Sequence, residues 1–334
     1  MVVTDRCRAR LASVALLPAL VLAVAAVACS SSSGSLVTSD SGMEEGSSHD
    51  TGATSPEGSA GKEAGPPVQR GPTALAISNA DPNGIFWDAT TGALYIADNL
   101  NDAVLTWTDK GGFKTLVSLP GPSGNDVGGL VQVADGTIVV VEFGFGTSGL
   151  VALVYSDLKT GTVPGLDPTR SRLGIALAPD GALYDTYFDK VSGAATGFVG
   201  KLDITAGTEV NVISGLMKPV GVAVVGSTLY FSDQDLGEIL AAPLSSLASY
   251  KTLSTNLSPD LLSVGPDGTI FSGSPAGVVY QIDTTTGTFN TLFTASGTLE
   301  PRGTAYDAVN KRLFVAEHDS SHIQNYIEIV PVGG

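Results

Sequence analysis

The chain has 334 residues, of which 43% are hydrophobic, and its 17 Lys and Arg against 33 Asp and Glu give a formal net charge of −16. This length allows one large domain or two ordinary ones, and the apolar fraction is too high for a chain that is disordered throughout. Because no excess of cations is available to displace counterions from phosphates, the charge argues against a nucleic-acid binder, and two Cys cannot form a disulfide scaffold.

The N-terminal residues 1–28 have the features of an export signal. Three arginines precede an apolar stretch over residues 11–27, which is short for a membrane span of about 20 residues. The stretch ends in Ala26-Val27-Ala28-Cys29, which resembles a bacterial lipobox. We therefore expect cleavage before Cys29 and lipidation of its thiol. A plain signal peptide and an uncleaved anchor with a chance Cys are the alternatives.

Residues 29–72 follow as a segment of Ser, Gly, Thr, Glu, Ala and Pro without an apolar period. Such a composition cannot bury enough surface to offset its ordering entropy, so we expect a flexible tether, with a docking peptide as the alternative. Ser30, rather than Asp, follows Cys29, which favours an extracytoplasmic lipoprotein of the outer membrane, facing the periplasm or the cell surface. The membrane is then a partner through the lipid on Cys29.

From residue 73 to the end of the chain, one pattern recurs: a turn, then a Leu/Ile-aromatic or β-branched strand that often ends in an acid. Successive copies begin 41 to 46 residues apart. The copies begin at Leu94, Ile138, Leu183, Leu229, Ile270 and Leu313. In three copies an Asp-Gly pair of the kind that joins tight hairpins comes just before the strand: Asp135-Gly136, Asp180-Gly181 and Asp267-Gly268.

Six units of about 43 residues, each with room for four short strands, predict an all-β fold, a six-bladed β-propeller over residues 73–334. The last unit has room for only three strands before the chain ends. We expect the segment Ala74-Leu75-Ala76-Ile77-Ser78 to supply the missing outer strand and to close the ring.

The loops that enter the inner strands and those that follow the second strands lie on one face of a propeller, around the channel. The domain has 12 basic residues, and three of them, Arg172, Lys218 and Arg302, fall at the six entries. They are either solvated loop charges or an anion-binding mouth, in which guanidinium groups could clamp a carboxylate or phosphate. Arg302 is the strongest candidate because it directly precedes Gly303.

The ends of the second strands carry acids in four copies: Asp98, Glu142, Asp233 and Glu317. A structural role is the first interpretation, since such acids accept backbone N–H bonds in the adjoining turn. A ring of carboxylates that binds a hard cation is the alternative. His318 and His322 are four residues apart outside any expected helix, which makes them a weak metal signal.

The repeats resemble NHL-repeat propellers and, more closely, the senescence-marker/gluconolactonase-like group. Pro82-Asn83-Gly84-Ile85-Phe86-Trp87-Asp88, followed by Leu94-Tyr95-Ile96-Ala97-Asp98, is similar to the opening blade of that group. The resemblance implies a lactonase whose divalent metal is held by a Glu, two Asn and an Asp at the channel mouth.

The residues of this chain depart from that ligand set. Asn83 stands at the position of the Glu, Asn125 matches the first Asn, and Leu173 and Val220 stand at the remaining two positions. Aliphatic side chains cannot ligate a cation. If a divalent cation such as calcium binds, the candidates are Asn83, Asn125 and Asp126.

Two functions from different classes follow. The first is a lipid-anchored, monomeric binding module without the intact family metal site. Its channel mouth, with Arg302, Arg172, Lys218, Asn83 and Asn125, would bind a small anionic ligand such as a sugar acid, or a protein partner, but no nucleic acid. The alternative is a metal-dependent, gluconolactonase-like lactone hydrolase of the periplasm.

Overall fold

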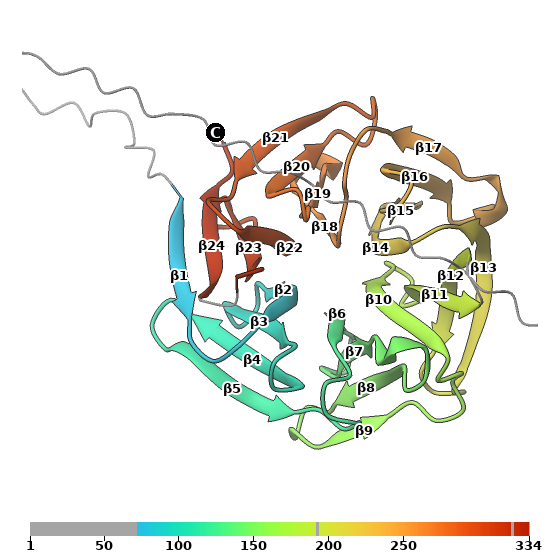
Figure 1. Cartoon of the computed structure of the whole chain (residues 1–334), viewed down its shortest axis with the longest axis horizontal. Coiled ribbons are helices and arrows are strands. Elements are labelled where there is room, and N and C mark those ends of the chain that lie inside the picture. The colour runs from blue at the N-terminus through green and yellow to red at the C-terminus, as the bar shows by residue number, and fades with distance from the viewer. Residues whose placement is uncertain (1–71, 192–193, 322–323, 334) are drawn as a thin grey trace, which may run out of the picture. The chain divides into compact units, whose positions relative to one another are not determined.

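The computed structural model of the chain describes residues 72–191, 194–321 and 324–333. These residues form 24 strands in six four-stranded sheets, each with its strands in antiparallel order, arranged around a central axis (Figure 1). The all-β, six-bladed β-propeller is therefore confirmed. The expected signal peptide, Cys29 and most of the tether lie outside the described residues.

Within each blade, the first strand lies nearest the axis and the fourth lies at the rim (Figure 1). The first strands are β2 (Pro82–Asp88), β6 (Val127–Gln132), β10 (Arg170–Leu177), β14 (Pro219–Val225), β18 (Leu262–Val264) and β22 (Leu299–Asp307). The second strands are β3 (Ala93–Asp98), β7 (Ile138–Glu142), β11 (Leu183–Val191), β15 (Thr228–Asp233), β19 (Ile270–Ser272) and β23 (Arg312–Asp319). These second strands coincide with the six recurring segments of the sequence.

The outer half of each blade completes the sheet. The third strands are β4 (Ala103–Thr108), β8 (Leu150–Val154), β12 (Ala194–Asp203), β16 (Glu238–Pro243), β20 (Val278–Ile282) and β24 (Asn325–Pro331). The fourth strands are β5 (Gly112–Ser118), β9 (Thr160–Thr162), β13 (Thr208–Leu216), β17 (Lys251–Ser254), β21 (Phe289–Thr294) and β1 (Thr73–Ile77). The described residues also contain three single-turn 3₁₀ helices: η1 (Gly144–Gly146), η2 (Leu247–Ser249) and η3 (Pro266–Gly268).

The N-terminal strand closes the ring, as expected. Strand β1 pairs antiparallel with β24, with Thr73 opposite Ile329 and Ile77 opposite Asn325. The side chain of Asn325 also donates to the carbonyl of Ala80, at 2.7 Å. The first and last strands of the propeller therefore belong to one sheet, which leaves no bare edge at the junction.

The core consists of six apolar clusters, one between each pair of neighbouring blades. Strand β7 shows why the second strands are continuous apolar runs. Ile138 and Val140 pack toward blade 1, whereas Val139 and Val141 pack toward blade 3. Because successive side chains of a strand point to opposite faces, a strand between two blades must be apolar at every position.

Within the described residues, no helix combines the length and the hydropathy that crossing a membrane requires.

Candidate functional site

The channel has three levels along the first strands. The first residues of these strands line a cavity of about 270 Å³, which we call the mouth. The next residues line a constriction of about 30 Å³, the waist. The following residues line a third cavity of about 360 Å³, the lower chamber. Because residues of all six blades line each level, the three spaces follow one another along the axis.

Five glycines at or beside the waist let adjacent blades approach each other closely. A Cβ atom built on Gly174 would lie 2.4 Å from the carbonyl oxygen of Val220, and one on Gly303 would lie 2.3 Å from that of Asn83. Gly84, Gly128 and Gly221 are equally crowded by the neighbouring blade. These glycines are required because the backbones of adjacent blades approach too closely for any side chain.

The mouth is lined by both apolar and polar side chains. Its apolar side chains include Val127, Leu173 and Val220 from consecutive blades, together with Phe143. Its polar and charged side chains are Asn83, Asn99, Asp126, Lys218, Gln234, Asp260, Glu300 and Arg302. A ligand of the mouth can therefore make both apolar and polar contacts.

Arg302 lies in the mouth as predicted. It is half-buried, and no carboxylate of the described residues comes within 4 Å of its guanidinium. Two acids, Asp260 and Asp126, interact with its charge over a longer distance. Burial raises the pKa of Asp260 and that of Asp126, and in both cases the charge of Arg302 opposes the rise. Within the described part of the chain, the guanidinium thus has no carboxylate in direct contact, although two partly desolvated carboxyl groups lie nearby.

Lys218 and Asn83 also line the mouth, but both are already engaged. The Nζ of Lys218 donates to Oε1 of Gln234 at 2.5 Å. The Nδ2 of Asn83 donates to the carbonyl of Val127 at 2.8 Å. Its Oδ1 accepts no hydrogen bond from the described residues. Both side chains are therefore held in place at the rim of the cavity.

Arg172 does not lie in the mouth, which corrects the prediction that three cations share it. Its side chain is completely buried, and it donates to both carboxylate oxygens of Glu209 at 3.0 and 2.9 Å. Burial acts to raise the pKa of Glu209, but its interactions with Asp185 and Arg172 outweigh burial and lower the pKa to about 2. Burial and the charge of Glu209 raise the pKa of Asp185.

The strand alternation explains this difference between Arg302 and Arg172. Arg302 directly precedes the waist glycine of its strand, whereas Arg172 stands one residue earlier than Leu173, which holds the equivalent place before Gly174. Successive side chains point to opposite faces, so Leu173 faces the mouth and Arg172 faces the interior of blade 3.

Asn125 also points away from the mouth. Its Nδ2 donates to Oε2 of Glu142 at 2.7 Å and to the carbonyl of Ser148 at 3.0 Å, and its Oδ1 accepts from Oγ of Ser148 at 2.6 Å. The next residue, Asp126, does line the mouth, with a left-handed φ of 53°. The amide of Asn125 is therefore used inside blade 2.

The side chains at the ligand positions implied by the family resemblance differ from that ligand set. Leu173 and Val220 line the mouth with aliphatic groups, and both polar ends of Asn125 are bonded elsewhere. Among the described residues, no three His, Cys, Asp or Glu side chains form a cluster suited to a metal ion. The donors present thus do not fit the four-ligand set.

Two of the four acids at the ends of the second strands hold the adjoining turn, as first interpreted. Asp98 accepts from the backbone N–H of Asp81 at 2.9 Å, and Asp233 accepts from those of Met217 and Lys218 at 2.7 and 3.0 Å. Glu142 and Glu317 are nearly inaccessible, and burial raises the pKa of each to about 7. Within the part of the chain that the structure describes, these carboxylates form no cluster suited to a metal ion.

A His–Asp pair beside the mouth was not predicted. Nδ1 of His318 lies 2.7 Å from Oδ1 of Asp81, and the side chains are 11% and 20% exposed. His318 stands opposite Glu300 in the β22–β23 ladder, and Glu300 lines the mouth. The two residues are 237 positions apart in sequence, and only ring closure brings them together. His322 lies outside the described residues.

The comparisons with solved structures identify the architecture. The luciferin-regenerating enzyme superposes with a TM-score of 0.65 at 15% identity, covering 79% of this chain and 96% of that one. A gluconolactonase from Xanthomonas campestris gives 0.64 at 19%, covering 78% and 89%. A calcium-binding protein, regucalcin from Agrobacterium tumefaciens, gives 0.59 at 15%, covering 76% and 93%. This chain has the six-bladed fold of gluconolactonase- and regucalcin-like propellers.

No family model matches the sequence, and no curated protein is significantly similar to it.

Proposed function

We propose that this propeller is a binding module whose mouth holds a small polyhydroxylated carboxylate, such as a sugar acid, without the metal of the gluconolactonase-like group. Arg302 carries the proposal, because its guanidinium is half-buried and has no carboxylate of the described residues within 4 Å. A planar guanidinium binds a carboxylate through two parallel hydrogen bonds. Such a ligand would replace a missing counterion.

The neighbouring groups favour hydroxyl-bearing ligands over simple anions. Asp126, Asp260 and the Oδ1 of Asn83 are hydrogen-bond acceptors, which can each receive a ligand hydroxyl. Leu173 and Val220, which also line the mouth, offer only apolar contact, which suits the C–H groups of a sugar acid. The ligand therefore places its carboxylate on Arg302, its hydroxyls on the acids and its C–H groups against these aliphatic side chains.

Isothermal titration calorimetry with a panel of gluconate, glucuronate and galacturonate tests this proposal. At least one should bind the wild-type protein, and Arg302→Ala should weaken it by about 1.5–3 kcal/mol, the range for a hydrogen bond to a charged group. Lys251→Ala, which removes an exposed cation of β17, is the matched control and should bind normally. Equal affinity of all three proteins contradicts the proposal.

The alternative function is a metal-dependent lactone hydrolase. The His318–Asp81 pair beside the mouth favours it, since a His held by a carboxylate can act as a general base. Hydrolysis of gluconolactone should then be measured with added calcium, manganese or zinc, beside metal analysis of the purified protein. Turnover that His318→Gln abolishes, together with stoichiometric metal, favours the hydrolase over the binding module.

We further propose that the propeller is attached to the outer membrane through lipid on Cys29, as a monomer on a flexible tether of residues 29–72. The arginine-rich start, the short apolar stretch and the small residues before Cys29 support this proposal. Two or three acyl chains anchor a protein stably where one does not. Cys29→Ser should move the protein into the soluble fraction and remove the lipid mass. Unchanged membrane partitioning and mass contradict it.

A further inference from the structure

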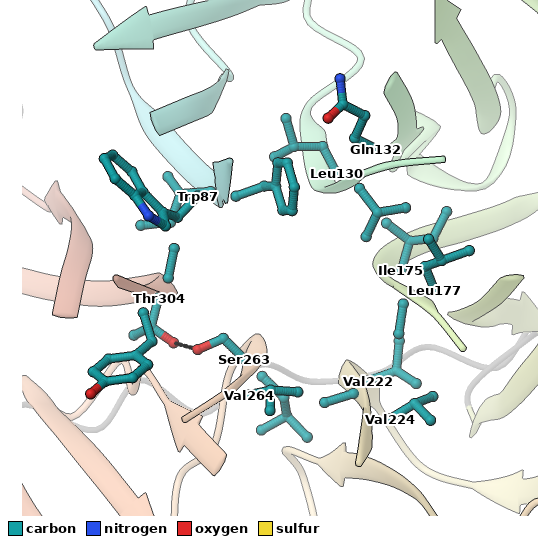
Figure 2. Close-up of a pocket in the computed structure, with 18 residues that line it drawn as sticks. Trp87, Leu130, Gln132, Ile175, Leu177, Val222, Val224, Ser263, Val264 and Thr304 are labelled. Atoms are coloured by element: carbon teal, nitrogen blue, oxygen red, sulfur yellow. Dashed lines mark hydrogen bonds between the residues drawn. The ribbon is translucent and has the colours of Figure 1, made fainter. Parts of the chain in front are cut away.

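The lower chamber is a second cavity of the channel, larger than the mouth and different in chemistry. Its volume is about 360 Å³, within the range of ligand pockets. Figure 2 shows the labelled side chains arranged around one central space, with Trp87, Leu130, Ile175, Val222 and Thr304 supplied by five different blades. The remaining blade, the fifth along the chain, contributes the short strand β18. The cavity is thus surrounded by the first strands of all six blades.

Most side chains that line the lower chamber are apolar, and none is charged. No Asp, Glu, Lys, Arg or His is among the described residues that line it. An ion placed there would lose its hydration without gaining a counterion, which is costly. A neutral molecule with an apolar body would instead release water from the aliphatic walls.

A few polar groups interrupt the apolar walls. Oγ of Ser263 and Oγ1 of Thr304 lie 2.6 Å apart and form one hydrogen bond, as Figure 2 shows. Two hydroxyls have two hydrogens, so this bond leaves one hydrogen available to a ligand acceptor. On another blade, Nε2 of Gln132 donates to the carbonyl of Gly136 at 3.2 Å, and its Oε1 remains an acceptor. These groups can orient a single polar group of a ligand.

The lower chamber is separate from the mouth. The waist between them, about 30 Å³, is much smaller than either cavity, because the backbones of adjacent blades approach closely there. At the other end, Val264 of β18 lines the chamber and is 43% exposed. A ligand would therefore enter from the face opposite the mouth.

We propose that the lower chamber binds one small neutral molecule with a ring-shaped apolar body and a single hydrogen-bonding group, such as an aromatic or alicyclic alcohol, amine, ketone or ester. The enclosure by six strands, the uncharged apolar walls and the paired hydroxyls all favour this class. The binding site does not depend on Arg302 or on any ligand of the mouth.

Fluorescence titration with N-phenyl-1-naphthylamine tests the proposal, because this neutral probe has an aromatic body and one N–H group. The full chain should bind it saturably at one site. The chain has two Trp, and only Trp87 lines the chamber, so in a Trp107→Phe background the probe should quench Trp87 emission. The sulfonated analogue 1-anilinonaphthalene-8-sulfonate, which has nearly the same body and a charge, should bind at least tenfold more weakly.

Substitutions of two valines distinguish probe binding in the chamber from probe binding elsewhere on the protein surface. Val264→Glu places a charge in the chamber and should weaken the probe at least tenfold, whereas Val264→Leu should bind within twofold of wild type. Val309→Glu is the matched control, since Val309 is 80% exposed and lies outside the chamber. Melting temperatures establish that all variants are folded. Absence of saturable binding, equal binding of the two probes, unchanged binding by a folded Val264→Glu, or displacement of the probe by a mouth ligand would overturn the proposal.

Discussion

Arg302 directly precedes the waist glycine of its strand, whereas Arg172 stands two residues before that of its own strand. The two side chains have opposite environments. Arg302 faces the mouth without a direct counterion, whereas Arg172 is buried against Glu209 and Asp185. Removing one member of a buried ion pair leaves the other charge uncompensated. We therefore expect Arg172→Ala to lower the free energy of unfolding by about 3–5 kcal/mol. Urea denaturation monitored by circular dichroism measures this change in the free energy of unfolding.

The exposed pair Lys159–Asp157 is the control for this substitution. Its side chains are 79% and 53% exposed, so the ion pair is solvated and contributes little to stability. Lys159→Ala should leave the denaturation midpoint nearly unchanged. If Arg172→Ala were equally harmless, the buried network of blade 3 would not stabilise the fold.

Glu317 makes the stability of the fold depend on pH. Its pKa is raised by burial, and further by Glu328, from 4.5 to about 7. Between these values the folded state binds more protons than the unfolded state, so this group's contribution to stability is complete below pH 4.5 and is lost as the pH rises through 7. The slope for one such group is at most about 1.4 kcal/mol per pH unit.

Glu317→Gln removes this titration while keeping the shape of the side chain. The variant should gain stability relative to wild type as the pH rises from 5 to 8, as measured by melting temperatures across that range. Glu238→Gln, at a half-buried position of β16, is the comparison. A stability difference between Glu317→Gln and wild type that stays constant with pH contradicts the assignment.

At the scale of single residues, sequence reasoning placed Arg302, Lys218 and Asn83 correctly because they belong to the entry loops of a repeated unit. It placed Arg172 and Asn125 in the mouth because a loop position does not specify which way a side chain points. The pairing of His318 with Asp81 could not be predicted, since it depends on the meeting of the two ends of the ring.

The closing strand β1 is the element on which the ring depends. It supplies the fourth strand of the last blade and covers the edge of β24. A chain that begins at Ala80 would lose β1 and expose that edge, whereas a chain that begins at Gly71 would keep it. We expect a much lower melting temperature for the shorter chain. Equal melting temperatures would show that closure contributes nothing.

The waist glycines are the second element-scale feature. A methyl group at Gly303 would meet the carbonyl oxygen of Asn83 at 2.3 Å, so the first and last blades would have to separate. Gly303→Ala should cost about 1–3 kcal/mol of folding stability, the range for overpacking. Gly333→Ala is the control, because no atom lies within 4 Å of its added Cβ. Equal denaturation midpoints for the two variants would contradict the crowded waist.

At the scale of elements, the sequence predicted the fold well for a physical reason. Six copies of one segment at nearly constant spacing leave little freedom in topology, and three strands in the last unit require a fourth from elsewhere. The three levels of the channel were not predicted. They depend on how closely the first strands approach one another, and no local pattern reports that distance.

The chain is acidic as a whole, but two basic side chains, Lys218 and Arg302, line its mouth. The chain carries a net charge of −16, which repels anions at long range, but physiological salt screens this to about 8–10 Å. Inside the mouth, close hydrogen bonds to Arg302 therefore decide affinity rather than the overall field. The central claim is that this guanidinium is the anchor for a carboxylate ligand.

A crystal structure of the propeller with the tightest-binding sugar acid tests that claim most directly. We expect the ligand carboxylate to bind the Arg302 guanidinium through two hydrogen bonds, with N–O distances of about 2.7–2.9 Å, and the ligand hydroxyls to bind Asp126 or Asp260. A structure in which Arg302 pairs with one of these acids, and the sugar acid lies outside the mouth, would contradict it.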